Sequence, residues 1–268
     1  MALMPSRKAL LKGPHSYMRK LSLILGLIAP LALAGLAPAE ASLDPKAVEV
    51  LKGMGDYLGS LPSLTLEVAD SVDKRDEQGR MLTFHHQRTI ELRRPDRLRV
   101  TVTGDLENDH LIYDGKLVTL VLGNDDLYAQ ADAAPTVEGT LDLLREKYGI
   151  RRPLMELLRH DVSARVVPQL KQVSYIGLAK IGGVECHHIA FNAVEGVEWQ
   201  LWVENDATPA PAKIVVHYSQ FPGEPRYIVQ SIKLNPNTTH ADSLFQFSPA
   251  EGVEKVPFEL SEDVGGQE

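Results

Sequence analysis

Alternation between apolar and polar residues dominates the chain after residue 63. A period of two appears first at Leu64, Leu66 and Val68, which alternate with Thr65, Glu67 and Ala69. Alternation of this kind places every apolar side chain on one face of a β-strand. The same period returns in the third predicted strand, where Leu98, Val100 and Val102 alternate with arginines and threonines. We predict that six residues of these two strands face the interior: Leu64, Leu66, Val68, Leu98, Val100 and Val102.

Short polar turns separate about ten such strands. Asp114-Gly115 and Gly182-Gly183 are typical hairpin turns, and Arg94-Pro95-Asp96 predicts a corner. Strands joined by short turns pair antiparallel, because a parallel pair needs a long crossover. We expect the second group of strands to begin at Ala164, and Phe245-Gln246-Phe247 to form the last strand.

Helical spacing interrupts this pattern at the start and in the middle of the chain. Apolar residues recur every three or four positions after Asp44-Pro45, a typical helix start. A second helix is predicted from Thr136 or Thr140 to Tyr148, and Pro153 starts a short third one. The fold class expected is therefore α+β, with helices packed on a strongly curved antiparallel sheet.

The N-terminal segment has a different composition from the rest of the chain. Five basic residues precede an apolar run at residues 21–37, and Ala39-Glu40-Ala41 fits a small-residue cleavage site. This order is typical of a secretory signal peptide. We predict that residues 1–41 are cleaved; the alternative is a retained membrane anchor, which the short, Pro- and Gly-interrupted run disfavours. No cysteine stands at the cleavage site, so an N-terminal lipid is not expected.

Removal of this basic leader leaves an acidic chain. The full sequence carries a net charge of −8 and residues 1–41 carry +4, so the remainder carries −12. This charge argues against nucleic acid as a partner. We expect residues 42–260 to form a single domain and residues 261–268 a disordered tail. We also expect a soluble, monomeric protein.

Candidate chemistry is sparse. The motifs of phosphate loops, dinucleotide-binding turns and nucleophile elbows are absent from the sequence. Cys186-His187-His188 and His85-His86 could supply metal ligands, but adjacent residues of a strand point to opposite faces. The single cysteine, Cys186, is expected to be buried, with pairing between chains as the alternative. We predict no enzyme activity, no metal site and no cofactor.

Three separated motifs resemble the LolA superfamily of periplasmic lipoprotein carriers. They are LRRPDRLRV at residues 92–100, YDGKL at residues 113–117 and LFQFSPAEGV at residues 244–253. Their order and spacing match nearly the whole chain after the leader. The chain most resembles an uncharacterised group of predicted periplasmic proteins in that superfamily.

This resemblance implies an antiparallel half-barrel whose helices cover a hydrophobic cavity on the concave face. It also implies that Arg94, just before the motif proline, latches the helical lid, as the equivalent arginine does in the carriers. An ordinary arginine at the end of a strand is the alternative for Arg94. The six predicted inward residues would line the cavity, or would be packed core.

The function expected from this resemblance is that of a periplasmic carrier. Its partner would be a lipid, a lipoprotein acyl chain or another hydrophobic ligand. The alternative is a non-enzymatic sensor or interaction module of the bacterial envelope, which would contact a membrane protein through a sheet edge or through the arginine-rich corner at residues 93–99.

Overall fold

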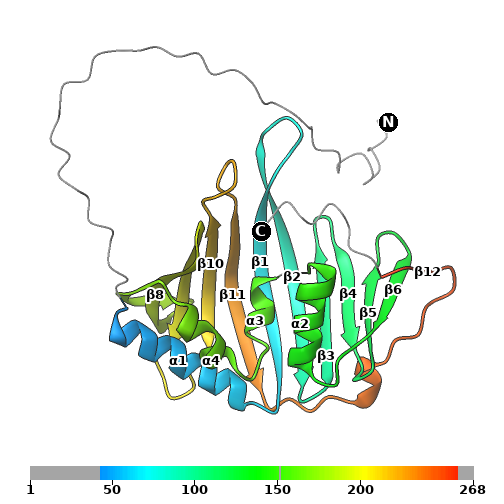
Figure 1. The fold of residues 1–268 in the computed structure, drawn as a ribbon, viewed down its shortest axis with the longest axis horizontal. Coiled ribbons are helices and arrows are strands. Elements are labelled where there is room, and N and C mark those ends of the chain that lie inside the picture. The colour runs from blue at the N-terminus through cyan, green and yellow to red at the C-terminus, as the bar shows by residue number, and fades with distance from the viewer. Residues whose placement is uncertain (1–42, 151, 259–268) are drawn as a thin grey trace.

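The computed structural model describes residues 43–150 and 152–258. Both the predicted signal peptide, residues 1–41, and the predicted tail, residues 261–268, lie outside these described residues. The polypeptide forms one continuous sheet with helices on one of its faces (Figure 1).

Twelve strands make up this sheet in the described part of the chain. They follow one another in space as β12-β6-β5-β4-β3-β2-β1-β11-β10-β9-β8-β7, so the sheet is open and its edges are β12 and β7. The strands are β1 (Ser63–Arg75), β2 (Met81–Arg93), β3 (Arg97–Gly104), β4 (Asn108–Tyr113), β5 (Leu117–Leu122), β6 (Leu127–Asp132), β7 (Gln172–Ile181), β8 (Val184–Val194), β9 (Val197–Glu204), β10 (Pro211–Tyr218), β11 (Arg226–Pro236) and β12 (Glu254–Val256).

Three predictions about the strands are wrong. The sheet has twelve strands instead of about ten, and its last pair, β12 with β6, is parallel. Residues 245–247 form no strand: Phe245 ends a 3-10 helix, η3 (Asp242–Phe245), that lies against the sheet and buries Phe245, and residues 246–247 are irregular. The chain thus crosses a face of the sheet before it joins the far edge as β12.

The helices follow the predicted boundaries at the start and in the middle of the chain. They are α1 (Pro45–Ser60), α2 (Val137–Tyr148), α3 (Pro153–Glu156) and α4 (Val162–Val166), followed by η2 (Val167–Gln169). Asp44 caps α1 by accepting hydrogen bonds from the backbone N–H groups of Lys46 and Ala47. Gly149 ends α2 with a φ of 62°, a left-handed conformation that glycine adopts without strain.

A strand was predicted to begin at Ala164, but this residue lies inside α4. The valine-rich composition favours a strand, yet α4 packs on α1. A Cβ atom added to Gly55 would come within 2.8 Å of the backbone nitrogen of Ser163, so the two helices touch closely at this glycine. The Ser163 hydroxyl also donates to Asp56 of α1. These tertiary contacts override the local preference.

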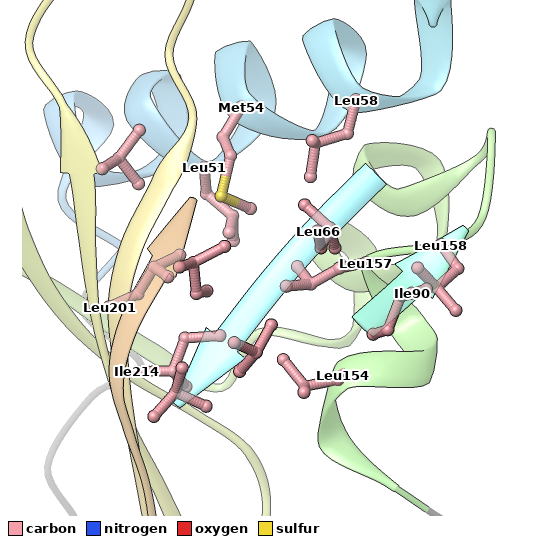
Figure 2. Close-up of a cluster of buried hydrophobic side chains, with 14 of the residues drawn as sticks. Leu51, Met54, Leu58, Leu66, Ile90, Leu154, Leu157, Leu158, Leu201 and Ile214 are labelled. Carbon is pink, nitrogen blue, oxygen red and sulfur yellow. The ribbon is translucent and has the colours of Figure 1, made fainter. Parts of the chain in front are cut away.

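The hydrophobic core lies between the helices and the sheet (Figure 2). Leu51, Met54 and Leu58 of α1 point toward Leu66 of β1. Leu154 and the other leucines that surround α3 cover the neighbouring part of the same face. This face of the sheet is the one that the predicted inward residues occupy.

Candidate ligand face and its helical cover

All six predicted inward residues lie on one side of β1 and β3, and Arg88 of β2 stands in register between Val68 and Val102. The strand β2 lies between them, and its Ile90 and Leu92 stand in register with both neighbours, so these residues share one side of the pleat. We call this surface the apolar face; its residues are Leu64, Leu66, Val68, Ile90, Leu92, Leu98, Val100 and Val102. Val100 is half-buried and the other seven are buried.

Leucines of the helices fill the space above the apolar face. All residues of the face except Val102 therefore belong to the hydrophobic core or pack against it in this structure. Two hollows of the described chain lie elsewhere, with volumes of about 730 Å³ and about 520 Å³, and no residue of the apolar face lines either of them.

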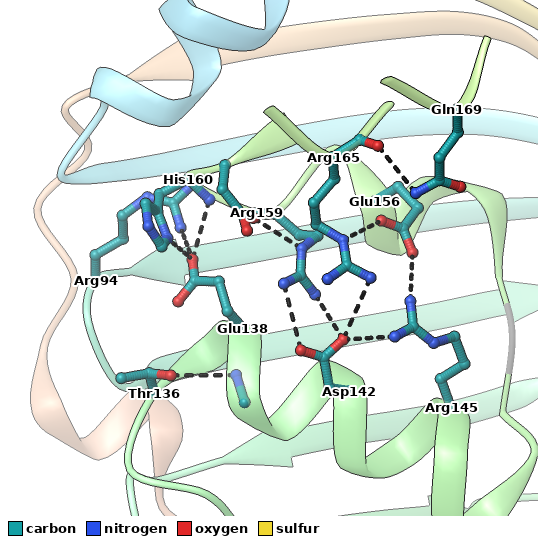
Figure 3. Close-up of polar contacts among 12 residues, drawn as sticks. Arg94, Thr136, Glu138, Asp142, Arg145, Glu156, Arg159, His160, Arg165 and Gln169 are labelled. Carbon is teal, nitrogen blue, oxygen red and sulfur yellow. Dashed lines mark hydrogen bonds and ion pairs between the residues drawn. The ribbon is translucent and has the colours of Figure 1, made fainter. Parts of the chain in front are cut away.

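Arg94 joins the corner between β2 and β3 to this helical cover (Figure 3). Its Nε donates to the carbonyl oxygen of Leu61, just after α1, at 3.1 Å. Its Nη1 donates to Oε1 of Glu138 in the first turn of α2 at 2.7 Å. Burial of this guanidinium lowers the pKa of Arg94 from its ordinary value. The predicted latch residue thus contacts the cover from the predicted corner.

Glu138 accepts this hydrogen bond from Arg94 and also contacts His160. The sequence did not identify it as a site residue. The Oε1 atom of Glu138 also lies 2.9 Å from His160 Nδ1 and accepts from the His160 backbone N–H at 3.0 Å. Burial raises the pKa of the Glu138 carboxyl, but hydrogen bonds from His160 and the charge of Arg94 outweigh it and hold the pKa below its ordinary value. The sequence shows only that an acid, Glu138, stands in the first turn after the N-cap residue Thr136, where its negative charge interacts favourably with the helix dipole.

Ion pairs unite α2, α3 and α4 (Figure 3). The Asp142 carboxylate of α2 pairs with Arg145 at 2.8 Å, with Arg159 at 3.1 Å and with Arg165 of α4 at 3.6 Å. Arg159, whose side chain is only 3% exposed, also pairs with Asp161 at 2.9 Å. We call these three helices and their ion pairs the helical unit. It covers the apolar face beside α1.

A buried charged cluster borders the apolar face, two residues beyond Val68. Asp70 accepts hydrogen bonds from Arg88, and its Oδ1 lies 3.1 Å from Nδ1 of His86. The Nε2 atom of His86 lies 3.8 Å from a carboxylate oxygen of Glu107. Burial raises the pKa of the Asp70 carboxyl, but the hydrogen bonds from His86 and Arg88 lower it by more, so this pKa lies below its ordinary value.

The histidine pairs are separated by the sheet, as the alternation predicted. His86 is 1% exposed whereas His85 is 67% exposed. His187 contacts the Tyr175 hydroxyl at 2.9 Å, and the His188 ring stacks on Trp202 on the opposite face. Cys186 is a buried free thiol. In the described ranges, 43–150 and 152–258, no group of three or more potential ligands could hold a metal ion.

The arginine-rich corner is engaged by the chain itself. Arg93 donates to the carbonyl of His240 and pairs with Asp242, Arg97 contacts Asp96, and Arg99 donates to the carbonyl of Leu244. A contact between this corner and a membrane protein stays a prediction. A helix that combines the length and the apolar composition of a membrane span is not found among the described residues.

The open sheet, its apolar face and the helices that cover this face agree with the half-barrel architecture expected from the three motifs. The chain belongs to the family described as predicted periplasmic protein (DUF2092), which matches residues 47–259. This is the kind of uncharacterised periplasmic group expected from the three motifs, and it agrees with the periplasmic location inferred from the N-terminal sequence. Curated proteins contain no match to the chain.

Several solved structures are similar to this chain. The lipoprotein LppX from Mycobacterium tuberculosis has a TM-score of 0.45 at 12% identity, over 74% of this chain and 99% of that one. MucB in the Pseudomonas aeruginosa MucA/MucB complex has a TM-score of 0.42 at 12% identity, over 76% and 61%. The LolA superfamily protein NE2245 from Nitrosomonas europaea has a TM-score of 0.34 at 9% identity, over 75% and 97%.

Proposed function

We propose that this protein is a non-enzymatic periplasmic carrier that binds a lipid, a lipoprotein acyl chain or another hydrophobic ligand on its apolar face. One observation carries the proposal. An aliphatic face of the sheet is covered by a helical unit that ion pairs hold together, that α4 joins to α1, and that Arg94 connects to the sheet through Glu138. This arrangement allows the cover to move as one piece.

The energetics of exchange favour such a ligand. Opening the cover would expose leucines of the helical unit and of the apolar face, at a cost of about 25 cal/mol per Å² of apolar surface. An acyl chain that takes the place of Leu154 and Leu157 would again cover Leu66 and Ile90, so most of the exposed apolar surface would be buried against the ligand. Opening without a ligand would leave the same surface in water.

Replacement of the latch residue tests this proposal. In Arg94→Ala the hydrogen bonds to Leu61 and Glu138 are lost, so the covered state loses stability relative to the open one. We expect a several-fold increase in the affinity for an environment-sensitive apolar dye, measured by fluorescence titration. Thermal unfolding of the same sample reports whether the variant stays folded.

Arg97→Ala is the matched control, because Arg97 lies at the same corner and pairs with its neighbour Asp96 instead of with Glu138 of the helical unit. Its dye affinity should equal that of the unmodified protein. Equal dye affinity of folded Arg94→Ala and Arg97→Ala would show that Arg94 is an ordinary arginine at the end of a strand.

A further inference from the structure

The face of the sheet opposite the helices carries a polar groove of about 730 Å³. Its floor consists of outward-facing residues of β2 and β3, and its wall is the segment that leads from β11 into η3. The lining residues are Thr89, Glu91, Arg99, Thr101, Thr239, His240, Ala241, Ser243 and Leu244.

The wall of the groove is fixed in place. His240 is buried, and its Nε2 lies 3.2 Å from the carbonyl oxygen of Leu64, to which it donates. Arg93 donates to the carbonyl of His240 at 2.9 Å, and the neighbouring Phe245 is fully buried. The groove is therefore formed without a ligand, and binding requires little ordering of the chain.

Two oppositely charged residues on the floor of the groove, Glu91 and Arg99, do not pair with each other. Glu91 and Arg99 stand directly opposite each other in the antiparallel pair of β2 and β3, where oppositely charged side chains usually bond. Arg99 instead donates from Nη1 to the carbonyl of Leu244 in the wall, at 3.0 Å. Within the described residues, no hydrogen bond or ion pair engages the Glu91 carboxylate.

Hydroxyl groups surround this separated pair. Thr89 and Thr101 stand in register on the floor, and Thr239 and Ser243 contribute from the wall. One carboxylate and one guanidinium leave the lining with no net charge, which disfavours strongly anionic or cationic ligands. Neighbouring hydroxyls of one ligand can donate to a carboxylate and accept from a guanidinium at the same time.

We propose that this groove binds a saccharide, a neutral and hydroxyl-rich ligand that bridges Glu91 and Arg99. The site is on the opposite side of the sheet from the apolar face and is independent of the carrier function. Loss of lipid binding would leave saccharide binding intact, and the reverse also holds.

NMR titration of the ¹⁵N-labelled protein tests the proposal, with the disaccharides chitobiose and trehalose as probes. We expect saturable shifts of amides at residues 89–91, 99–101 and 239–244 with at least one disaccharide. Alanine, a zwitterion, and inorganic phosphate should cause none. Absence of a saturable shift with both disaccharides, or equal shifts with alanine or phosphate, would overturn the proposal.

Variants then assign the binding to this groove. Glu91→Ala should weaken disaccharide binding about tenfold, the loss expected for a hydrogen bond to a charged group. Thr239→Ala, on the wall, should weaken it less, and Glu77→Ala, on an exposed turn outside the groove, should leave it unchanged. An unchanged dissociation constant in Glu91→Ala, with amide dispersion showing a folded protein, would contradict the assignment.

Discussion

Asp70 is the residue with the clearest consequence for stability. Its carboxylate is buried and contacts both His86 and Arg88, so Asp70→Asn removes the nearest counter-charge of the Arg88 guanidinium and leaves it the Glu107 carboxylate at 4.0 Å. Breaking a buried ion pair by removing one partner costs about 3–5 kcal/mol. We predict a loss of this size in the free energy of unfolding at pH 7, measured by urea titration.

This loss should depend on pH with a defined sign. The pKa of Asp70 is lowered in the folded protein, so its contribution is complete above the ordinary value of 3.8 and declines as the pH falls below it. The difference between the unmodified protein and Asp70→Asn should therefore shrink between pH 5 and pH 3. Asp132→Asn, on an exposed position, should show little effect at either pH. A difference that stays constant over this interval would contradict the assignment to Asp70 ionisation.

Residues of the candidate site differ in how far the sequence could predict them. The apolar face follows from alternation alone, because a two-residue period assigns each side chain to a face. Arg94 was identified only through the resemblance of residues 92–100 to a known corner. Glu138 and His160 were missed, because their contact joins two helical segments and no local pattern records which acid will meet which base.

At the scale of elements, the helical unit depends on Asp142. Asp142→Ala removes the common partner of Arg145, Arg159 and Arg165. Because Asp161 still pairs with Arg159, we predict a cost of about 1–3 kcal/mol, the range for a buried polar group that loses one partner. Hydrogen–deuterium exchange should accelerate in α2, α3 and α4 and stay unchanged in β1 and β2.

Glu146→Ala is the control for this variant, because Glu146 is exposed and pairs with Arg145 of the same helix, α2. It should leave exchange in α3 and α4 unchanged. Faster exchange throughout the sheet in Asp142→Ala would show that the three helices are part of the main cooperative core instead of a separate unit.

Element prediction succeeded where local chemistry decides the structure. Asp44-Pro45 marks the start of α1, and Asp114-Gly115 forms the turn between β4 and β5, with Gly115 at a φ of 94°. It failed where tertiary contact decides, as at α4, which the close approach to Gly55 of α1 keeps helical. The parallel strand β12 also forms only because it pairs with β6, which is distant in the sequence. Its three residues alone do not show which strand they will pair with.

At the scale of the whole molecule, the two faces of one sheet have different chemistry. The face under the helices is mainly aliphatic and covered, whereas the opposite face carries the polar groove at β2 and β3 and a smaller apolar cluster of Cys186, Trp202 and Ala212. The carrier proposed above would hold its ligand on the covered face. The net charge of −12 after residue 41 disfavours lasting attachment to anionic membranes.

Native mass spectrometry of the protein purified from its own periplasm tests the carrier function most directly. We predict a population of protein with one bound lipid or acylated ligand, which disappears after delipidation and returns when the periplasmic lipid extract is added. Protein without any bound lipid, together with no binding of an apolar dye by unmodified protein or by folded Arg94→Ala, would contradict the carrier function.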